Sequence, residues 1–128
     1  MSLLLDTCTV LWLARGDMQV STRQRSAIAS DADVWISAAS AWEIAIKHAM
    51  GRLPLPVPVK QFVREIRERY QFKLLAIDEE SALLVAKLPP LHRDPFDRVL
   101  VSQAIVHGLT IVTPDPAVTD YPVRTVWL

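Results

Sequence analysis

The chain has 128 residues, 51% of them hydrophobic and 22% charged, so we expect one globular domain over residues 1–128 and exclude a disordered or low-complexity chain. Fourteen basic residues balance fourteen acidic ones, and no overall charge therefore points to a nucleic acid as partner. If four acids gather around a metal ion, however, the fourteen basic residues are matched by only ten acidic ones elsewhere.

Short apolar runs alternate with segments of helical periodicity in the first half of the chain. The segment RLPLPVPV, residues 52–59, differs from both, because its three prolines forbid a helix and favour an extended chain. The elements expected before it are a strand at Leu3–Leu5, a helix at Thr7–Ala14, a helix capped by Ser21 that ends at Ser30, a strand at Val34–Ile36 and a helix at Ala39–Met50 closed by Gly51.

The second half of the chain repeats this alternation. The expected elements are a helix at Lys60–Tyr70, a strand or extended segment at Phe72–Ile77, a helix from its cap Asp78 to Leu88, a helix at Pro95–His107, a strand at Leu109–Val112 and a last strand at Val123–Trp127. Apolar strands that alternate with helices predict an α/β sandwich around a mostly parallel sheet.

The stretch HRDPFDRVL, residues 92–100, places two acids at the head of an apolar helix. Asp94 suits the N-cap, Pro95 the first helical position and Asp97 the third. There the free N–H groups and the helix dipole favour a carboxylate. Taken alone, this stretch is explained better by helix capping than by an active site.

Three further acids occupy comparable places. Asp6 and Asp115 each follow an expected strand, and Glu43 lies in the opening turns of the helix after Val34–Ile36. Each has a structural explanation: Asp6 can cap a helix, Ser40 and Glu43 have capping-box spacing, and Asp115 can be a turn residue. Capping does not predict, however, that these acids and Asp97 gather at one edge of the sheet, where open α/β sheets bind ligands.

A pocket with four carboxylates requires a compensating cation, because the negative charges repel each other. The sequence has no His–Cys cluster with zinc spacing, and ligation by oxygen alone suits Mg²⁺ or Mn²⁺. Such an ion polarises phosphoryl oxygens and acidifies bound water. The residues therefore predict metal-dependent hydrolysis of a phosphate ester.

Four segments together resemble, in order, the PIN-domain ribonucleases, and among these the VapC toxins of bacterial type II toxin–antitoxin systems. The segments are LLLDTCTVLWLA, SAASAWEIAIKHAMGRLPLP, HRDPFDRVLVSQAI and LTIVTPDPAV…YPVRTVW. The resemblance implies a PIN-like three-layer sandwich whose sheet of about five short strands is flanked by helices. It also implies an endoribonuclease with one or two Mg²⁺ ions in an acidic pocket, a homodimer, and a VapB-type antitoxin whose C-terminal segment enters that pocket.

Carried over residue by residue, the resemblance makes Asp6 and Asp97 the principal Mg²⁺ ligands. Glu43 and Asp115 would complete the catalytic pocket, directly or through water. Thr7 and Thr113 match hydroxyl positions that support the acids, whereas Asp94 is read as the helix cap. The prolines on both sides of Asp115 depart from the family pattern and bear on where its carboxylate points.

Other polar and aromatic residues receive a structural interpretation. Lys47, Arg52, Arg93 and Arg98 lie near the acids in sequence, and of these only Arg98 is favoured as a phosphate contact. The lone Cys8 excludes an internal disulfide, agrees with the cytoplasm and is expected in the core. No apolar run reaches membrane length, so no membrane contact is expected. The tryptophans are assigned to core or dimer packing ahead of base stacking.

Three other functions would use similar residues. A phosphatase of the haloacid dehalogenase type needs a second acid two residues after the first, where this chain has Cys8. A catalytically silent metal-binding domain and a DNA-directed nuclease both stay open, because neither the four acids nor the metal chemistry distinguishes RNA from DNA.

Overall fold

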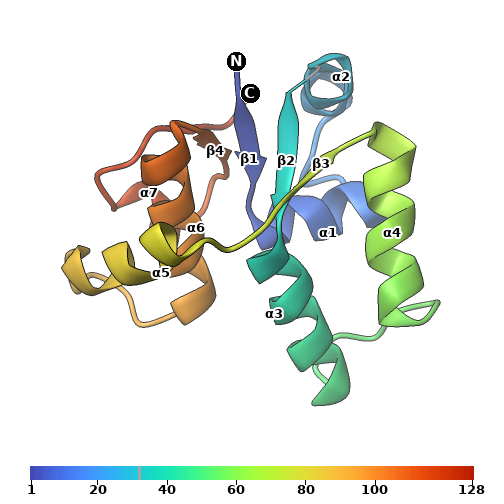
Figure 1. Cartoon of the computed structure of the whole chain (residues 1–128). Coiled ribbons are helices and arrows are strands. Elements are labelled where there is room, and N and C mark those ends of the chain that lie inside the picture. Colours follow the sequence, from blue (N-terminus) through green and yellow to red (C-terminus); the bar gives the residue numbers. More distant parts are fainter. Residues whose placement is uncertain (32) are drawn as a thin grey trace.

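The computed structural model describes residues 1–31 and 33–128. Strands and helices alternate along most of the chain (Figure 1). The strands are β1 (Leu3–Leu5), β2 (Val34–Ser37), β3 (Lys73–Leu75), β4 (Thr110–Val112) and β5 (Thr125–Val126). The helices are α1 (Thr7–Arg15), α2 (Thr22–Ser30), α3 (Ala38–Ala49), α4 (Val59–Tyr70), α5 (Glu79–Leu84), α6 (Pro95–His107) and α7 (Pro116–Thr119), and a 3₁₀ turn, η1 (Val85–Lys87), follows α5.

The strands form one parallel sheet in the order β3-β2-β1-β4-β5. In the centre, Leu4 of β1 is aligned with Trp35 of β2 and with Ile111 of β4. The chain leaves β1 in one direction to form β2 and β3, and it builds β4 and β5 on the other side. The β1–β4 pair is therefore the switch point of the sheet, where a crevice opens at the carboxyl ends of the strands. The predicted α/β fold with a parallel sheet is confirmed.

Both faces of the sheet are apolar, as a sheet covered on two sides requires. Leu3 and Leu5 of β1 pack with α1, α2 and α4, whereas Leu4 packs with α6 on the other face. All three leucines are buried. Figure 1 shows α5, α6 and α7 on one side of the sheet and α1, α2 and α4 on the other. The predicted three-layer arrangement is confirmed.

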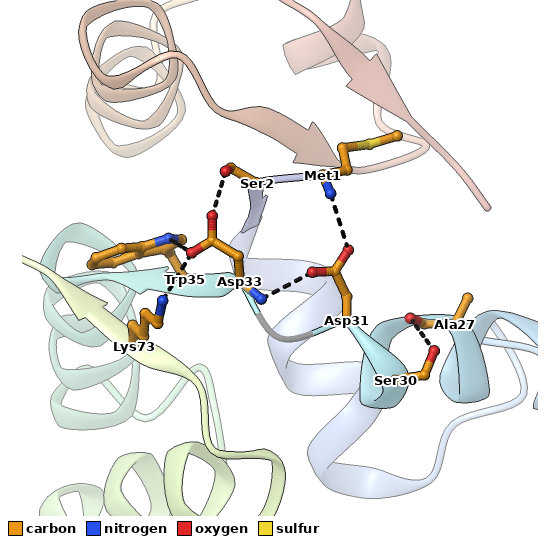
Figure 2. Close-up of polar contacts among 8 residues, drawn as sticks. All are labelled: Met1, Ser2, Ala27, Ser30, Asp31, Asp33, Trp35 and Lys73. Carbon is orange, nitrogen blue, oxygen red and sulfur yellow. Dashed lines mark hydrogen bonds and ion pairs between the residues drawn. The ribbon is translucent and has the colours of Figure 1, made fainter.

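A polar cluster fixes the amino ends of three strands (Figure 2). Asp33, just before β2, accepts hydrogen bonds from the Ser2 hydroxyl, from Trp35 Nε1 at 2.8 Å and from Lys73 Nζ at 3.0 Å. The hydrogen bond from Ser2, followed by those from Lys73 and Trp35, lowers the pKa of Asp33 to about 2. These contacts connect the residues at the amino ends of β1, β2 and β3, which the backbone pairing aligns in parallel register.

Several elements differ from the sequence prediction; the last strand, for example, covers only Thr125–Val126 of the predicted Val123–Trp127. The helix predicted to end at Leu88 changes at Val85 into η1, because Leu88 precedes Pro89 and takes an extended conformation. The strand predicted at Phe72–Ile77 is limited to Lys73–Leu75. The short helix α7 was not predicted. Among the described residues, no helix is both long and apolar enough to cross a bilayer.

Candidate active site

One pocket at the carboxyl edge of the sheet collects all four predicted acids. Its volume is about 160 Å³. It is lined by Asp6, Thr7, Cys8, Glu43, Lys47, Asp94, Asp97 and Asp115. Five of these eight side chains are carboxylic acids and only one is a cation, so the pocket has a strong excess of negative charge.

Asp6 lies at the floor of the pocket and is 2% exposed. It follows β1 directly and caps α1, because its Oδ1 accepts a hydrogen bond from the Thr9 amide at 2.9 Å. Its Oδ2 accepts from the Thr113 hydroxyl and from the Cys8 thiol, with 3.1 Å between Oδ2 and Sγ. The Asp6 carboxylate is therefore held by two residues of α1 and by Thr113, the residue that follows β4.

Glu43 lies in the second turn of α3 and is 5% exposed. The predicted capping box of Ser40 and Glu43 is wrong, because Ser37 caps α3 through the Ala39 amide. The Glu43 Oε2 atom instead accepts a hydrogen bond from the Lys47 ammonium. Its Oε1 atom is buried and has no hydrogen-bond partner in the part of the chain that the structure describes.

The start of α6 combines a helix cap with a pocket acid. Asp94 Oδ1 accepts hydrogen bonds from the amides of Phe96 at 2.9 Å and Asp97 at 3.4 Å, so Asp94 is the N-cap as predicted. Asp97, three residues further, lines the pocket. Burial raises the pKa of Asp97 to about 7, and the charges of Asp94, Glu43, Asp115 and Asp6 add to this increase.

Asp115 reaches the pocket through the helix that was not predicted. It caps α7 by accepting a hydrogen bond from the Ala117 amide at 2.9 Å, and its own amide donates to the Thr113 hydroxyl at 3.0 Å. Pro116 occupies the first helical position. The two flanking prolines therefore do not turn Asp115 away from the other acids.

The structure corrects the prediction for Arg98. Its guanidinium donates to the carbonyl oxygens of Pro89 and Val85, both at 2.9 Å, and to the Tyr121 hydroxyl at 3.0 Å. It does not line the pocket. Arg98 therefore anchors the segment between η1 and α6, and the expected phosphate contact is wrong.

Two residues that were expected to have only a structural or surface role, Cys8 and Lys47, line the pocket. Cys8, expected in the core, lines the pocket, where burial and the charge of Asp6 raise the pKa of its thiol and keep it neutral. Lys47 bonds Glu43 across one helical turn, and this bond raises the pKa of its ammonium. The spacing of four residues was the signal for this pair. Thr7, expected to support an acid, donates to the Ser40 hydroxyl at 3.0 Å instead.

The donor set fits a hard divalent cation. All five acids offer oxygen ligands, and the buried, unpaired Glu43 Oε1 atom together with the raised pKa of Asp97 indicates negative charge that a cation would compensate. Within the described ranges, no three His, Cys, Asp or Glu side chains are arranged so that they could hold a metal ion among themselves.

Comparisons with known proteins agree with this arrangement. The family model described as PIN domain matches residues 3–123. Ribonuclease VapC22 from Mycobacterium tuberculosis is 28% identical over 131 residues, with 98% of each chain covered. VapBC2 from Rickettsia felis, solved with a DNA fragment from their promoter, has a TM-score of 0.75 at 14% identity and 98% coverage of both chains. FitAcB from Neisseria gonorrhoeae has a TM-score of 0.68 at 24% identity, covering 96% of this chain and 95% of the other.

Proposed function

The chain belongs to the PIN-domain family, and from this premise we propose that it is a metal-dependent endoribonuclease that acts as the toxin of a type II toxin–antitoxin system. The observation that carries the proposal is the meeting of Asp6, Glu43, Asp97 and Asp115 in one pocket. The chain resembles, along 98% of its length, a relative that is named as a ribonuclease, and this likeness supports the choice of RNA as substrate. We propose further that residues 1–128 act as a single PIN domain.

The carboxylates have distinct roles in this proposal. Asp6 and Asp97 hold a divalent cation, with Mg²⁺ as the natural ion and Mn²⁺ as a substitute. Glu43 and Asp115 complete the site directly or through water. The unpaired Oε1 of Glu43 supports its part, because a buried carboxylate oxygen without a partner is costly unless a ligand binds it.

The chemistry follows from the charges around the pocket. A bound divalent cation supplies Lewis acidity, which polarises a phosphoryl oxygen and makes the attacking water more acidic. Thr113 and the Thr9 amide orient the Asp6 carboxylate, so that its lone pairs point in a fixed direction. Lys47 neutralises Glu43 and lowers the repulsion that the pocket exerts on a phosphate.

We also propose partners for this toxin. Structural neighbours include VapBC2 from Rickettsia felis and VapBC from Salmonella typhimurium, and by analogy the partner is a VapB-type antitoxin whose C-terminal segment enters the acidic pocket. A homodimer is expected, and its test is the molar mass in solution. The cytoplasm is the proposed location, because the RNA substrate is there and Cys8 is a free thiol.

The test is cleavage of a mixed tRNA and mRNA pool by the purified chain, with Mg²⁺ and with EDTA. Asp6→Asn and Asp97→Asn are run alongside, with Glu68→Gln as the control, because Glu68 is exposed on α4 and does not line the pocket. We expect discrete fragments with Mg²⁺ for the wild type and Glu68→Gln, and a loss of at least about 100-fold for the two pocket variants.

Other outcomes separate the alternatives. A folded wild type that binds Mg²⁺ without cleaving RNA or single-stranded DNA is a silent metal-binding domain. Cleavage of DNA alone identifies a DNA-directed nuclease. Cleavage that persists in both pocket variants contradicts the proposed site.

A further inference from the structure

The two residues that precede the pocket acids of α3 and α6 are aromatic, and they touch each other. Trp42 precedes Glu43, and Phe96 precedes Asp97. The centroids of their rings are 4.9 Å apart, and the ring planes meet at 84°. This edge-to-face contact fixes the orientation of Trp42 beside the acidic pocket.

Trp42 is exposed although tryptophan is usually buried. Its exposed fraction is 53%. Successive residues of a helix point about 100° apart, and Ser40 and Ile44, which are 0% and 1% exposed, face the interior. Trp42 therefore lies on the outer side of α3. The assignment of this tryptophan to the core is excluded, which leaves dimer packing and base stacking.

The surroundings of Trp42 favour an anionic, base-bearing ligand. Figure 1 shows α3 between α6 and α4. On the α6 side Glu43 lines the acidic pocket. On the α4 side Ala41 lines a mainly apolar groove together with Val59, Val63 and the side chains of the cations Lys60, Arg64 and Arg67. Trp42 therefore stands between a groove edged by three cations, which can contact phosphates at short range, and the pocket that is proposed to cleave them.

The charge balance favours a contact that does not depend on charge. The chain has no net charge, and the pocket itself repels phosphate, so long-range attraction contributes little to RNA binding. Stacking of a nucleobase on an aromatic ring strengthens binding roughly 5- to 150-fold per base and does not depend on charge. Single-stranded RNA is commonly bound through unstacked bases on such rings.

We propose that Trp42, oriented by Phe96, stacks a nucleobase of single-stranded RNA next to the scissile phosphate. This inference rests on the proposed ribonuclease function and adds a substrate-positioning residue to it. The preferred substrate is then an unpaired loop or single strand with a base adjacent to the cleaved bond, because a base within a duplex cannot reach the ring.

The test is binding, measured without cleavage. Fluorescence anisotropy in EDTA compares a labelled single-stranded pentaribonucleotide with the matching abasic ribose-phosphate pentamer. We compare the wild type, Trp42→Phe and Trp42→Ala. The control is Met50→Ala, which removes another exposed apolar side chain just beyond the end of α3. Stacking predicts that removing the bases weakens wild-type binding about 10-fold or more.

The expected result is a loss of this base-dependent affinity in Trp42→Ala, with retention within about 3-fold in Trp42→Phe and Met50→Ala. A folded Trp42→Ala protein that still distinguishes the two probes overturns the inference, whatever its molar mass. Dissociation of a dimer by Trp42→Ala with unchanged base dependence assigns the ring to dimer packing. A wild type that cleaves RNA and binds both probes equally also overturns the inference, whereas a wild type that neither binds nor cleaves RNA overturns the proposed function with it.

Discussion

The pocket changes the protonation of Asp97. Burial, with the charges of Asp94, Glu43, Asp115 and Asp6, raises its pKa from 3.8 to about 7. Between about pH 4 and pH 7 the folded chain keeps a proton that the unfolded chain has lost. In the absence of metal, the free energy of unfolding therefore falls as the pH rises through this window and stays lower above it.

Asp97→Asn removes this penalty. In EDTA at pH 8 we expect the variant to be more stable than the wild type by about 1–2 kcal/mol, a value reduced for the partial exposure of the group. At pH 4.5 most of the difference should disappear. Urea denaturation at both pH values measures it, with Glu68→Gln as the control. A difference of the same size at both pH values would show that charge crowding at Asp97 is not its cause.

Lys47 is expected to contribute to stability through Glu43. Lys47→Met leaves the buried Glu43 carboxylate without its ammonium, and we expect a loss of about 1–3 kcal/mol in EDTA, reduced because the Lys47 side chain is 45% exposed. Glu43→Gln in the same chain should restore part of the loss, because the uncompensated charge is gone. Urea denaturation of the two single variants and the double variant gives the coupling energy. Strict additivity of the single effects would contradict the pairing.

At the level of elements, the same residues begin helices and line the pocket. Asp6 caps α1, Asp94 caps α6 ahead of Asp97, and Asp115 caps α7. The free backbone N–H groups at the start of each helix donate to one oxygen of the capping carboxylate. The remaining lone pairs of that carboxylate stay available to the pocket. Capping and catalysis therefore do not compete here, and the sequence patterns that indicate one also serve the other.

This overlap explains what the sequence could and could not predict. Helix α6 was predicted to the residue, because Asp94, Pro95 and Gly108 mark its ends locally. The meeting of Asp6 with Asp115 followed from the parallel strands before them. Helix α7, only four residues long, has too few residues for a periodic pattern. The role of Arg98 depends on carbonyl groups that only the folded chain brings close.

Arg98 connects α6 to Val85, Pro89 and Tyr121 through hydrogen bonds. Arg98→Met should lower the free energy of unfolding by about 2–3 kcal/mol, because Val85 and Pro89 lose a charged hydrogen-bond donor. Arg98→Lys should recover less than half, since one ammonium cannot reach all these acceptors. Urea denaturation tests the stability, and hydrogen exchange of residues 85–91 tests the local effect. Full recovery by lysine would mean that charge alone, and not the fork of donors, is needed.

At the level of the whole molecule, the pocket joins distant parts of the chain. Residues from Asp6 to Asp115 contribute to it, from α1, α3, α6 and the segment after β4. Because the carboxylates repel each other, the folded state concentrates a charge that the unfolded chain disperses. The site is therefore a source of instability that a bound cation would reverse.

Mg²⁺ is accordingly expected to stabilise the entire fold. An ion that binds only the folded chain adds about 2.7 kcal/mol at a concentration 100-fold above its Kd, which corresponds to a rise in Tm of roughly 10 °C. A thermal melt with increasing Mg²⁺ measures the shift, EDTA should reverse it, and K⁺ at equal ionic strength separates specific binding from screening. Glu68→Gln should keep the shift, and Asp6→Asn and Asp97→Asn should lose most of it. An equal shift in both pocket variants would place the ion elsewhere, because a ligand stabilises the fold only through the groups that bind it.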